Sequence, residues 1–459
     1  MSSPPPRQLH LNLFLMGVGH HEAAWRHPRT DPSRLSDIRH FQQLAATAEA
    51  AAFDSVFLAD GVEGPAPGSN AWVSHFEPIT LLSALAVSTE RIGLIGTVST
   101  GFTEPYNLAR QFASLDHLSN GRAGWNIVTS AGDRAARNFG RDSNQDHATR
   151  YERAAEYLEV VGGLWDSWED DALLLDRATG RATAPGKLHE LDHRGKHFQV
   201  LGPLNIPRGP QGHPLLVQAG SSEDGREFAA RYAEAVFTAQ QTLDEGQAFY
   251  GDLKRRAAAL GRDPGQVVVL PGIVPVLGST EAEAKALDEE LDLLIDPTRA
   301  VGTLSALLGV DLSDHPLDAP LPPLPPVTAI NGAKSRFELV RDLAERDGLT
   351  LRRLIGRLGG GRGHQVLAGT PEQVADHIEL WFTQGAADGF NVMPPILPEG
   401  LDLFTEHVVP LLRERGLFRH EYRGTTLREH YGLPRPANRY TNHDPNRSAN
   451  RLANRLANH

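Results

Sequence analysis

The sequence predicts an α/β protein built as a (β/α)8 TIM barrel, and three observations support that prediction. Eight short apolar runs of the kind found in buried parallel strands are spread along the chain. Amphipathic helical patterns separate most of these runs. Polar residues directly follow several runs, at the strand ends where barrel enzymes carry their chemistry. Eight strands with intervening helices favour one barrel over separate domains.

The strands and helices follow from local periodicity. We expect strands at residues 11–15, 55–58, 92–95, 123–128, 215–218, 235–238, 267–276 and 389–392. Between them we expect helices at residues 37–51, 78–88, 148–168, 224–232, 243–260 and 281–294. A further helix precedes residue 119, because Leu108, Phe112, Leu115 and Leu118 recur at three- and four-residue spacing and Asn120-Gly121 stops the pattern.

The length of the chain predicts large insertions over the C-terminal face of the barrel. A barrel needs about 250 residues, so roughly 200 of the 459 must lie outside it. Residues 170–212 read as a hairpin and an irregular arm laid over the barrel mouth. Residues 297–364 hold packed prolines, a helical piece at 335–345 and the glycine run 358–363, and we expect a mobile lid. We expect residues 1–440 to form a single domain that contains both insertions. Residues 441–459 are expected to be a low-complexity tail.

Composition excludes several functional classes. The formal net charge is -12 and no long basic run appears, which argues against nucleic acid and anionic membranes as partners. The chain has no cysteine, so disulfides, thiolate nucleophiles and iron–sulfur clusters are excluded, and redox chemistry would need a bound cofactor. The apolar stretch at residues 9–18 is too short to cross a bilayer, and we expect a cytoplasmic protein.

His20 and His21 follow the first expected strand. Adjacent histidines are not spaced to point two side chains the same way along a strand, so no metal site is expected. One of the pair is a candidate acid, base or hydrogen-bond donor to a peroxide, and the alternative is that both only tie down the loop. His364 follows the glycine run and would join the site when the lid closes.

Other strand ends carry candidate ligand contacts. Asp60 ends the second strand, where a carboxylate either accepts a ring N–H or caps the loop. Thr97 and Asn126 end the third and fourth strands, and their alternative role is that of ordinary strand residues. The side chains of Arg26, Lys334 and Arg362 could pair with a substrate carboxylate, although surface solvation explains them equally simply.

Two helix starts favour an anion. His147 and Tyr151 lie four apart in the first turns of the expected helix at 148–168, on one face. Ser221 and Ser222 lie between a strand and a helix, where free N–H groups point outward. One interpretation is that these residues bind a phosphate. The alternative is that Ser222 is an ordinary helix cap and Tyr151 is a core residue. The run LGGGRGH is no dinucleotide fingerprint, because it does not join a strand to a helix.

Taken together, these segments resemble the bacterial-luciferase-like flavin monooxygenases, in the branch containing nitrilotriacetate monooxygenase component A and dibenzothiophene-sulfone monooxygenase. The resemblance covers nearly the whole chain. It rests on the motifs GHHEAAWRHP, FDSVFLADG, EPYNLARQFASLDHLSNGRAGWNIVTS, QAGSSEDGREFAARYAEAVFTAQQ, GTPEQVADHIELWFTQGAADGFNVMPP and GLFRHEYRGTTLREHYGLPRPANRY. The segment after Tyr440 departs from the pattern.

The resemblance implies a barrel that binds reduced FMN from a separate NAD(P)H:FMN reductase. It implies that dioxygen then forms a flavin hydroperoxide or peroxide that oxygenates a small organic compound such as a sulfone, an amine or an aminopolycarboxylate. A homodimer or higher homo-oligomer is implied as well. Matching motifs would place FMN against Asp60, Thr97, Asn126, His147, Tyr151, Ser221 and Ser222, and would place His20 and His364 on the substrate or peroxide side.

Three other functions stay open at this point. A deazaflavin-dependent dehydrogenase on the same fold would transfer hydride without oxygen. A metal-dependent hydrolase would use His20, His21 and further acidic residues. A flavin-binding or scaffolding protein would show no turnover. We expect the FMN monooxygenase.

Overall fold

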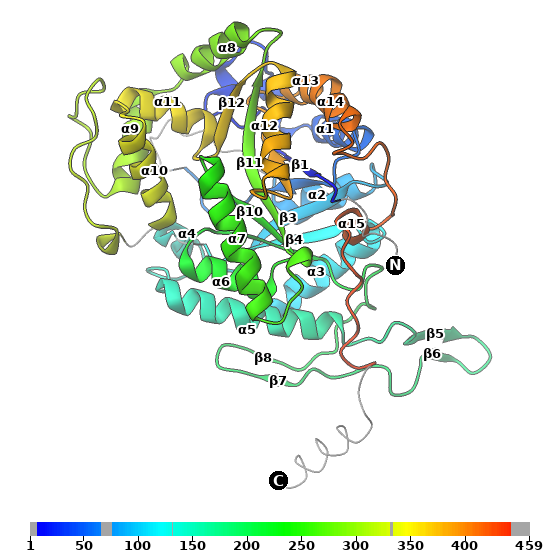
Figure 1. The fold of residues 1–459 in the computed structure, drawn as a ribbon. Helices are drawn as coiled ribbons and strands as arrows, with labels where there is room; N and C mark the ends of the chain where they lie inside the picture. Colours follow the sequence, from blue (N-terminus) through cyan, green and yellow to red (C-terminus); the bar gives the residue numbers. More distant parts are fainter. Residues whose placement is uncertain (1–6, 66–75, 131, 331–333, 442–459) are drawn as a thin grey trace.

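The computed structural model describes residues 7–65, 76–130, 132–330 and 334–441. At its centre lies a parallel sheet with the strand order β10-β9-β4-β3-β2-β1-β13-β11-β12 (Figure 1). The sheet closes on itself because β11 (Val268–Leu277) also pairs with β10 (Ala235–Thr238). The other barrel strands are β1 (His10–Phe14), β2 (Ser55–Leu58), β3 (Gly93–Ser99), β4 (Ala123–Val128), β9 (Leu215–Ala219) and β13 (Gly389–Val392). These are the eight expected strands, and the TIM-barrel prediction is confirmed.

A ninth parallel strand was not expected. β12 (Gln365–Gly369) pairs with the second half of β11, from Ile273 to Leu277. Its five residues directly follow the glycine run, and so short a segment carries no periodicity that separates it from a loop. The extra strand holds His364 against the barrel wall.

The helices around the barrel are α1 (Ile38–Ala50), α2 (Pro78–Ala86), α3 (Pro105–Leu118), α4 (Asp133–Asn138), α5 (His147–Trp165), α6 (Glu223–Tyr232), α7 (Leu243–Ala259), α8 (Glu281–Leu293), α12 (Pro371–Thr383), α13 (Glu399–Leu403) and α14 (Val409–Glu414). Seven of them, α1, α2, α3, α5, α6, α7 and α8, correspond to expected segments, whereas α4, α12, α13 and α14 were not expected. The apolar face of α3 is buried except at Leu118, the last residue of the helix, which is 58% exposed. None of the described helices combines the length and apolarity that a bilayer crossing requires.

The insertion at residues 297–364 forms a helical layer with a core of its own. It consists of α9 (Pro297–Leu308), α10 (Lys334–Arg346) and α11 (Leu351–Gly361), grouped at one side of the barrel in Figure 1. The sequence predicted only the middle helix. The glycines at 359–361 form the buried last turn of α11, and the space of a side chain on Gly359 is occupied by Ile295. This run therefore permits close helix packing.

The insertion at residues 170–212 lies away from the barrel mouth, so its expected position was wrong. Its two hairpins, β5–β6 (Leu173–Asp176 with Arg181–Thr183) and β7–β8 (His193–Arg194 with Gln199–Val200), extend beneath α5 in Figure 1. The carboxylate of Glu156 on α5 accepts hydrogen bonds from the amides of His197 and Phe198. Proline, glycine and charge predict an irregular segment, but they do not say which surface it covers.

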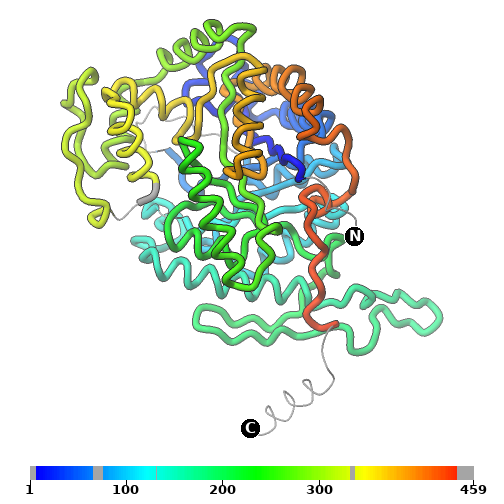
Figure 2. The backbone as a smooth tube through the Cα atoms, in the orientation of Figure 1, coloured from blue at the N-terminus to red at the C-terminus, as the bar shows by residue number. Residues whose placement is uncertain are grey.

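The segment from residue 418 to 441 closes the N-terminal end of the barrel. It carries the short helix α15 (Leu427–His430), and Figure 2 shows this red segment passing along the molecule from the barrel end. Leu427 fills the space left by the missing side chains of Gly93 and Gly124. The hydroxyl of Tyr431 donates to Asn12 Oδ1 at 2.8 Å, while its ring stacks on His10. The interior of the barrel is thereby sealed at this end.

We expect Leu427→Ala to lower the free energy of unfolding by about 2–5 kcal/mol, because the side chain is fully buried and leaves a cavity that the two glycines cannot fill. The thermal unfolding midpoint measures the change. Leu293→Ala removes the same atoms from a side chain that is 86% exposed, and it serves as the control. Equal midpoints for both variants would contradict the role given to Leu427.

Candidate active site

Three neighbouring cavities run along the C-terminal ends of the barrel strands. Cavity A, of about 550 Å³, lies between the ends of β4 and β9 and the starts of α5 and α6. Cavity B, of about 600 Å³, lies between β10 and α10, and cavity C, of about 440 Å³, lies between the loop after β1 and α9 and α11. Ser221 and Glu338 line both A and B, and Arg336 lines both B and C. Neighbouring cavities therefore share walls, and together they make up the candidate site.

Cavity A contains four of the predicted residues, namely His147, Tyr151, Ser221 and Ser222. Ser222 is the N-cap of α6 and its hydroxyl accepts from the amide of Gly225 at 3.2 Å. α5 starts at His147, so the positive ends of two helices meet at this cavity. His147 Nδ1 lies 2.8 Å from Asp224 Oδ2, which holds its ring at the rim. The structure therefore brings these four predicted residues together at one cavity.

Arg150 also lines cavity A, and sequence reasoning missed it. Its Nη1 donates to the carbonyl of Gln145 at 2.6 Å, while its buried Nε has no hydrogen-bond partner. Among the described residues no carboxylate lies within 4.0 Å of this guanidinium, and burial lowers its pKa. A single arginine in a helical pattern is normally solvated, so the sequence held no signal for its burial.

The chemistry of cavity A fits a phosphate ester. Gly220 lets the backbone pass close to Gln218, because a Cβ there would lie 2.6 Å from Gln218 Nε2. The unpartnered Arg150 Nε, the hydroxyls of Ser221 and Tyr151 and the two helix starts offer donors to an anion. Gln218 Oε1 is buried without a partner as well, and it can accept from a hydroxyl of an attached chain.

Thr97 and Asn126 are adjacent on β3 and β4. Asn126 Nδ2 donates to Thr97 Oγ1 at 2.8 Å, whereas Asn126 Oδ1 is buried without a partner. Asp60 lies half-buried at the end of β2, and burial raises the pKa of its carboxyl. In the part of the chain that is described, no hydrogen bond joins Asp60 to another predicted site residue. The structure thus brings the first two together and leaves Asp60 separate.

His20 and His364 face each other across the barrel mouth, with ring centroids 6.3 Å apart. The loop carrying His20 is clamped to residues 394–396, since His20 N donates to the carbonyl of Pro394 at 2.8 Å. Gly19, at φ +130°, lies so close to Pro395 that no side chain fits there. The ring of His364 stacks on Phe237 at 4.9 Å and lies flat over Gly272. His364 is therefore already part of the site wall.

Both of these histidines are neutral near pH 7. Burial and the nearby Arg336 guanidinium lower the pKa of His364 to about 3. Burial and Arg362 hold the pKa of His20 well below its usual value, and neither of its ring nitrogens has a partner. His21 differs, because its Nε2 faces Asp292 at 3.3 Å and its Nδ1 accepts from the amide of Ala23. The loop-tying role considered for the pair therefore belongs to His21.

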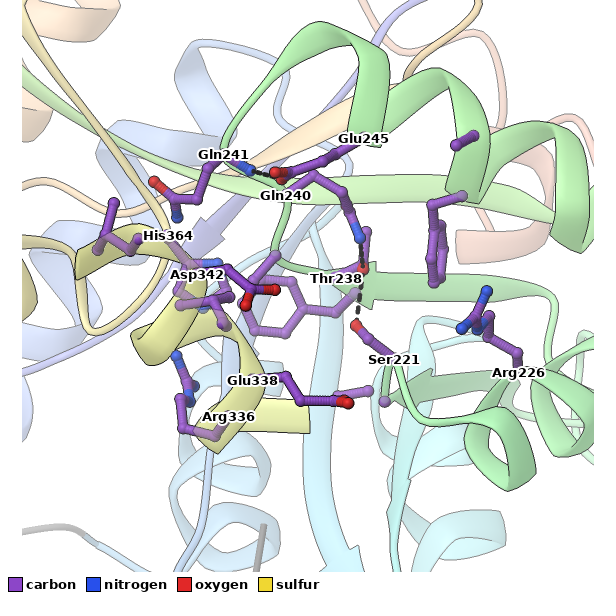
Figure 3. A pocket seen from close by; sticks show the side chains of 18 of the residues that line it. Ser221, Arg226, Thr238, Gln240, Gln241, Glu245, Arg336, Glu338, Asp342 and His364 are labelled. Atoms are coloured by element: carbon purple, nitrogen blue, oxygen red, sulfur yellow. Dashed lines mark hydrogen bonds between the residues drawn. The ribbon is translucent and has the colours of Figure 1, made fainter. Parts of the chain in front are cut away.

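The remaining polar residues of the mouth are grouped around cavity B. Figure 3 shows Ser221 and Gln240 hydrogen-bonded to Thr238, with Arg336 and Glu338 facing them from α10. Within the described ranges, no three or more His, Asp or Glu side chains are grouped to hold a metal ion. Of the three cations named above, Arg362 lines cavity C and Arg26 bonds to the carbonyl of Leu294 at the surface. The Lys334 side chain lies outside the described residues.

The chain matches the family model described as luciferase-like monooxygenase over residues 16–388. It is 50% identical to N-acetyl-S-(2-succino)cysteine monooxygenase of Bacillus subtilis (strain 168), over 95% of this chain and 98% of that protein. It is 48% identical to nitrilotriacetate monooxygenase component A of Aminobacter aminovorans, over 94% of this chain and 98% of that protein.

Solved structures give the same result. EDTA monooxygenase from Chelativorans sp. BNC1 is 38% identical with a TM-score of 0.80, over 94% of this chain and 99% of that one. A riboflavin lyase solved with modified FMN and riboflavin is 32% identical with a TM-score of 0.82, over 93% and 96% of the two chains. An F420-dependent secondary alcohol dehydrogenase is only 15% identical with a TM-score of 0.55, a likeness that shows the fold alone. The chain therefore belongs to the luciferase-like monooxygenase family and is a flavin monooxygenase built on a TIM barrel.

Proposed function

We propose that the protein is the oxygenating component of a two-component monooxygenase, which uses reduced FMN from a separate NAD(P)H:FMN reductase and dioxygen to oxygenate a small organic compound. The observation that carries the proposal is cavity A, where two helix starts, two serines and an unpaired buried guanidinium suit the phosphate of FMN. The relative named as a component A supports a separate reductase.

In this proposal Arg150, Tyr151, Ser221 and Ser222 hold the phosphate, with His147 at the rim. Thr97 and Asn126 offer a hydroxyl and a free amide oxygen to the polar edge of the ring system, and Asp60 does so from the end of β2. When bound, reduced FMN supplies the electrons that activate dioxygen. Each predicted cofactor residue is thus assigned either to the phosphate or to the ring system of FMN.

His20 and His364 act on the opposite side. Their unpartnered ring nitrogens, Nδ1 and Nε2 of His20 and Nδ1 of His364, can hold or pass a proton beside the reacting atoms. The rings of Phe14, Phe57 and Phe237 pack together at centroid distances of 5.3–5.7 Å and exclude water from this side. Assembly as a homodimer or higher homo-oligomer stays a prediction from the resemblance.

Anaerobic mixing of the protein with reduced FMN, followed by oxygen, tests the proposal. We expect reduced FMN to bind more tightly than oxidised FMN and to consume oxygen in its bound form, with a rate distinct from that of free reduced FMN. Reduced deazaflavin is the matched control, because it separates this reaction from hydride transfer on the same fold. Failure to bind reduced FMN, or hydride transfer from the deazaflavin to an organic acceptor, would overturn the proposal.

A further inference from the structure

Cavity C combines an apolar wall with an unusual group of cations. Its apolar part comes from α9 and α11, including Leu304, Leu307 and Leu358. Its charged part consists of the guanidinium groups of Arg299, Arg336 and Arg362 and the single carboxylate of Glu22. Three positive charges thus face one negative charge in a cavity of about 440 Å³.

The one carboxylate is already engaged. Glu22 Oε1 lies 3.4 Å from Arg299 Nη1, which leaves Arg336 and Arg362. Across the described ranges, neither of these two has a carboxylate within 4.0 Å, whereas the exposed Arg352 of the same insertion pairs with Asp318 at 2.8 Å. The excess of two positive charges is therefore carried by Arg336 and Arg362.

A hydrogen bond to the backbone holds the side chain of Arg336 close to Arg362. Arg336 on α10 donates to the carbonyl oxygen of Arg362, and its guanidinium takes the space that a side chain on Gly363 would need. Burial, and then repulsion by Arg362, lowers the pKa of Arg336. Arg336 is half-buried and Arg362 is exposed at the edge of cavity C, so both guanidinium groups are accessible to a ligand. Two neighbouring like charges without a close carboxylate repel each other, and a bound anion relieves that repulsion.

The position of the pair connects it to the chemistry of the mouth. Arg362 precedes His364 by two residues, and Arg336 lines cavity B together with His364 and Phe237. An anion held by the two guanidinium groups would therefore extend its remaining atoms either along the apolar wall of cavity C or toward the histidine pair. Cavity A, with Arg150, lies at the other end of the site.

We infer that Arg336 and Arg362 recognise the substrate, and that this substrate is a small organic acid carrying at least two carboxylates. The charge excess of two matches a dicarboxylate or a larger polycarboxylate, planar guanidinium groups suit carboxylate oxygens, and the leucines contact the carbon chain. The inference rests on the proposed function in one respect: it takes the bound acid to be the compound that the enzyme oxygenates. Neutral sulfones and alkanes are excluded from this role.

Titration calorimetry on the full-length protein saturated with oxidised FMN tests the inference. The probe is tricarballylate, which has three carboxylates and no oxidisable heteroatom, so its binding is read without any turnover. We expect Arg362→Gln and Arg336→Gln each to weaken tricarballylate binding at least tenfold, and Arg362→Lys to weaken it less. Arg352→Gln removes the same charge from the outer face of α11 and should leave the affinity unchanged. The triamide of the probe should not bind.

Two results would overturn the inference: no tricarballylate binding by the wild-type protein, or the same affinity in the Arg362→Gln, Arg336→Gln and wild-type proteins. Because Arg336 also supports the turn at Gly363, its variant is compared by thermal unfolding, and Arg362→Gln carries the conclusion if that variant unfolds early. Reduced-FMN binding measured on the same variants separates the two claims. Normal flavin binding and oxygen uptake without acid binding defeats only this inference, whereas acid binding without flavin binding defeats the proposed function.

Discussion

Replacing His364 with phenylalanine is expected to lower kcat by about two orders of magnitude or more and to leave the Kd of reduced FMN unchanged. Phenylalanine keeps the stacking on Phe237, but it removes both ring nitrogens, of which Nδ1 is buried without a hydrogen-bond partner. Loss of a positioned proton-transfer group typically costs 10²–10⁴-fold in rate. Single-turnover product formation with a substrate that the wild-type protein oxidises measures the effect. His315→Phe, at a half-exposed position of the insertion, is the control.

The same variant has a pH signature. The pKa of His364 is about 3 in the folded protein, below the ordinary value of 6.5 that holds when the chain is unfolded. Below pH 6.5 the unfolded chain therefore binds a proton that the folded protein does not, and this residue destabilises the fold by up to about 1.4 kcal/mol per pH unit. Lowering the pH from 7.5 to 5 should reduce the thermal midpoint of the wild-type protein more than that of His364→Phe. A loss of equal size in both would show that His364 titrates normally.

Arg150→Gln is expected to raise the Kd of reduced FMN by tenfold or more. The buried guanidinium has an unpartnered Nε and lines cavity A together with Ser221 and Tyr151. Truncating one partner of a buried charge pair costs about 2–5 kcal/mol. Fluorescence titration under anaerobic conditions measures the change. His147→Ala and Ser222→Ala should weaken binding less, because His147 lies at the rim and Ser222 also caps α6.

Reduced riboflavin, which lacks the phosphate, provides the internal control for this prediction. Its affinity should be the same for the wild-type protein and for Arg150→Gln, since the proposed function places only the phosphate end of the ligand in cavity A. If the variant weakened riboflavin and FMN equally, the loss would come from a general disturbance of the site. Unchanged FMN affinity would remove Arg150 from the phosphate end.

Sequence patterns predicted the barrel well because each strand and helix is a local feature. The eight strands are short apolar runs bounded by helical periodicity, and both signals lie within a dozen residues. Ser221, Ser222, His147 and Tyr151 were found because helix starts have a recognisable pattern. The position of the arm at 170–212 was not predictable in this way, because its contacts with α3 and α5 depend on packing between distant segments.

Charge without a partner was the main feature that sequence reasoning could not supply. Arg150, Arg336 and Arg362 look like ordinary surface arginines in the sequence. The folded chain places all three along cavities and, among the described residues, puts no carboxylate within 4.0 Å of them. The pairing of Arg336 with the backbone of Arg362 joins residues 26 positions apart. Whether a carboxylate neutralises an arginine depends on all the residues that the fold brings near it, most of which are distant in the sequence.

Closure of the N-terminal end of the barrel by the segment at residues 418–441 has a consequence for folding during synthesis. Strands β1 to β4 emerge from the ribosome early, yet the hollow beside Gly93 and Gly124 waits for Leu427, which is synthesised some three hundred residues later. Until Leu427 is in place, the apolar interior of the incomplete barrel stays accessible to water and to other nascent chains. Chaperone demand should therefore be set by the delay before residue 427 is translated, and slowing translation just upstream of it should raise aggregation.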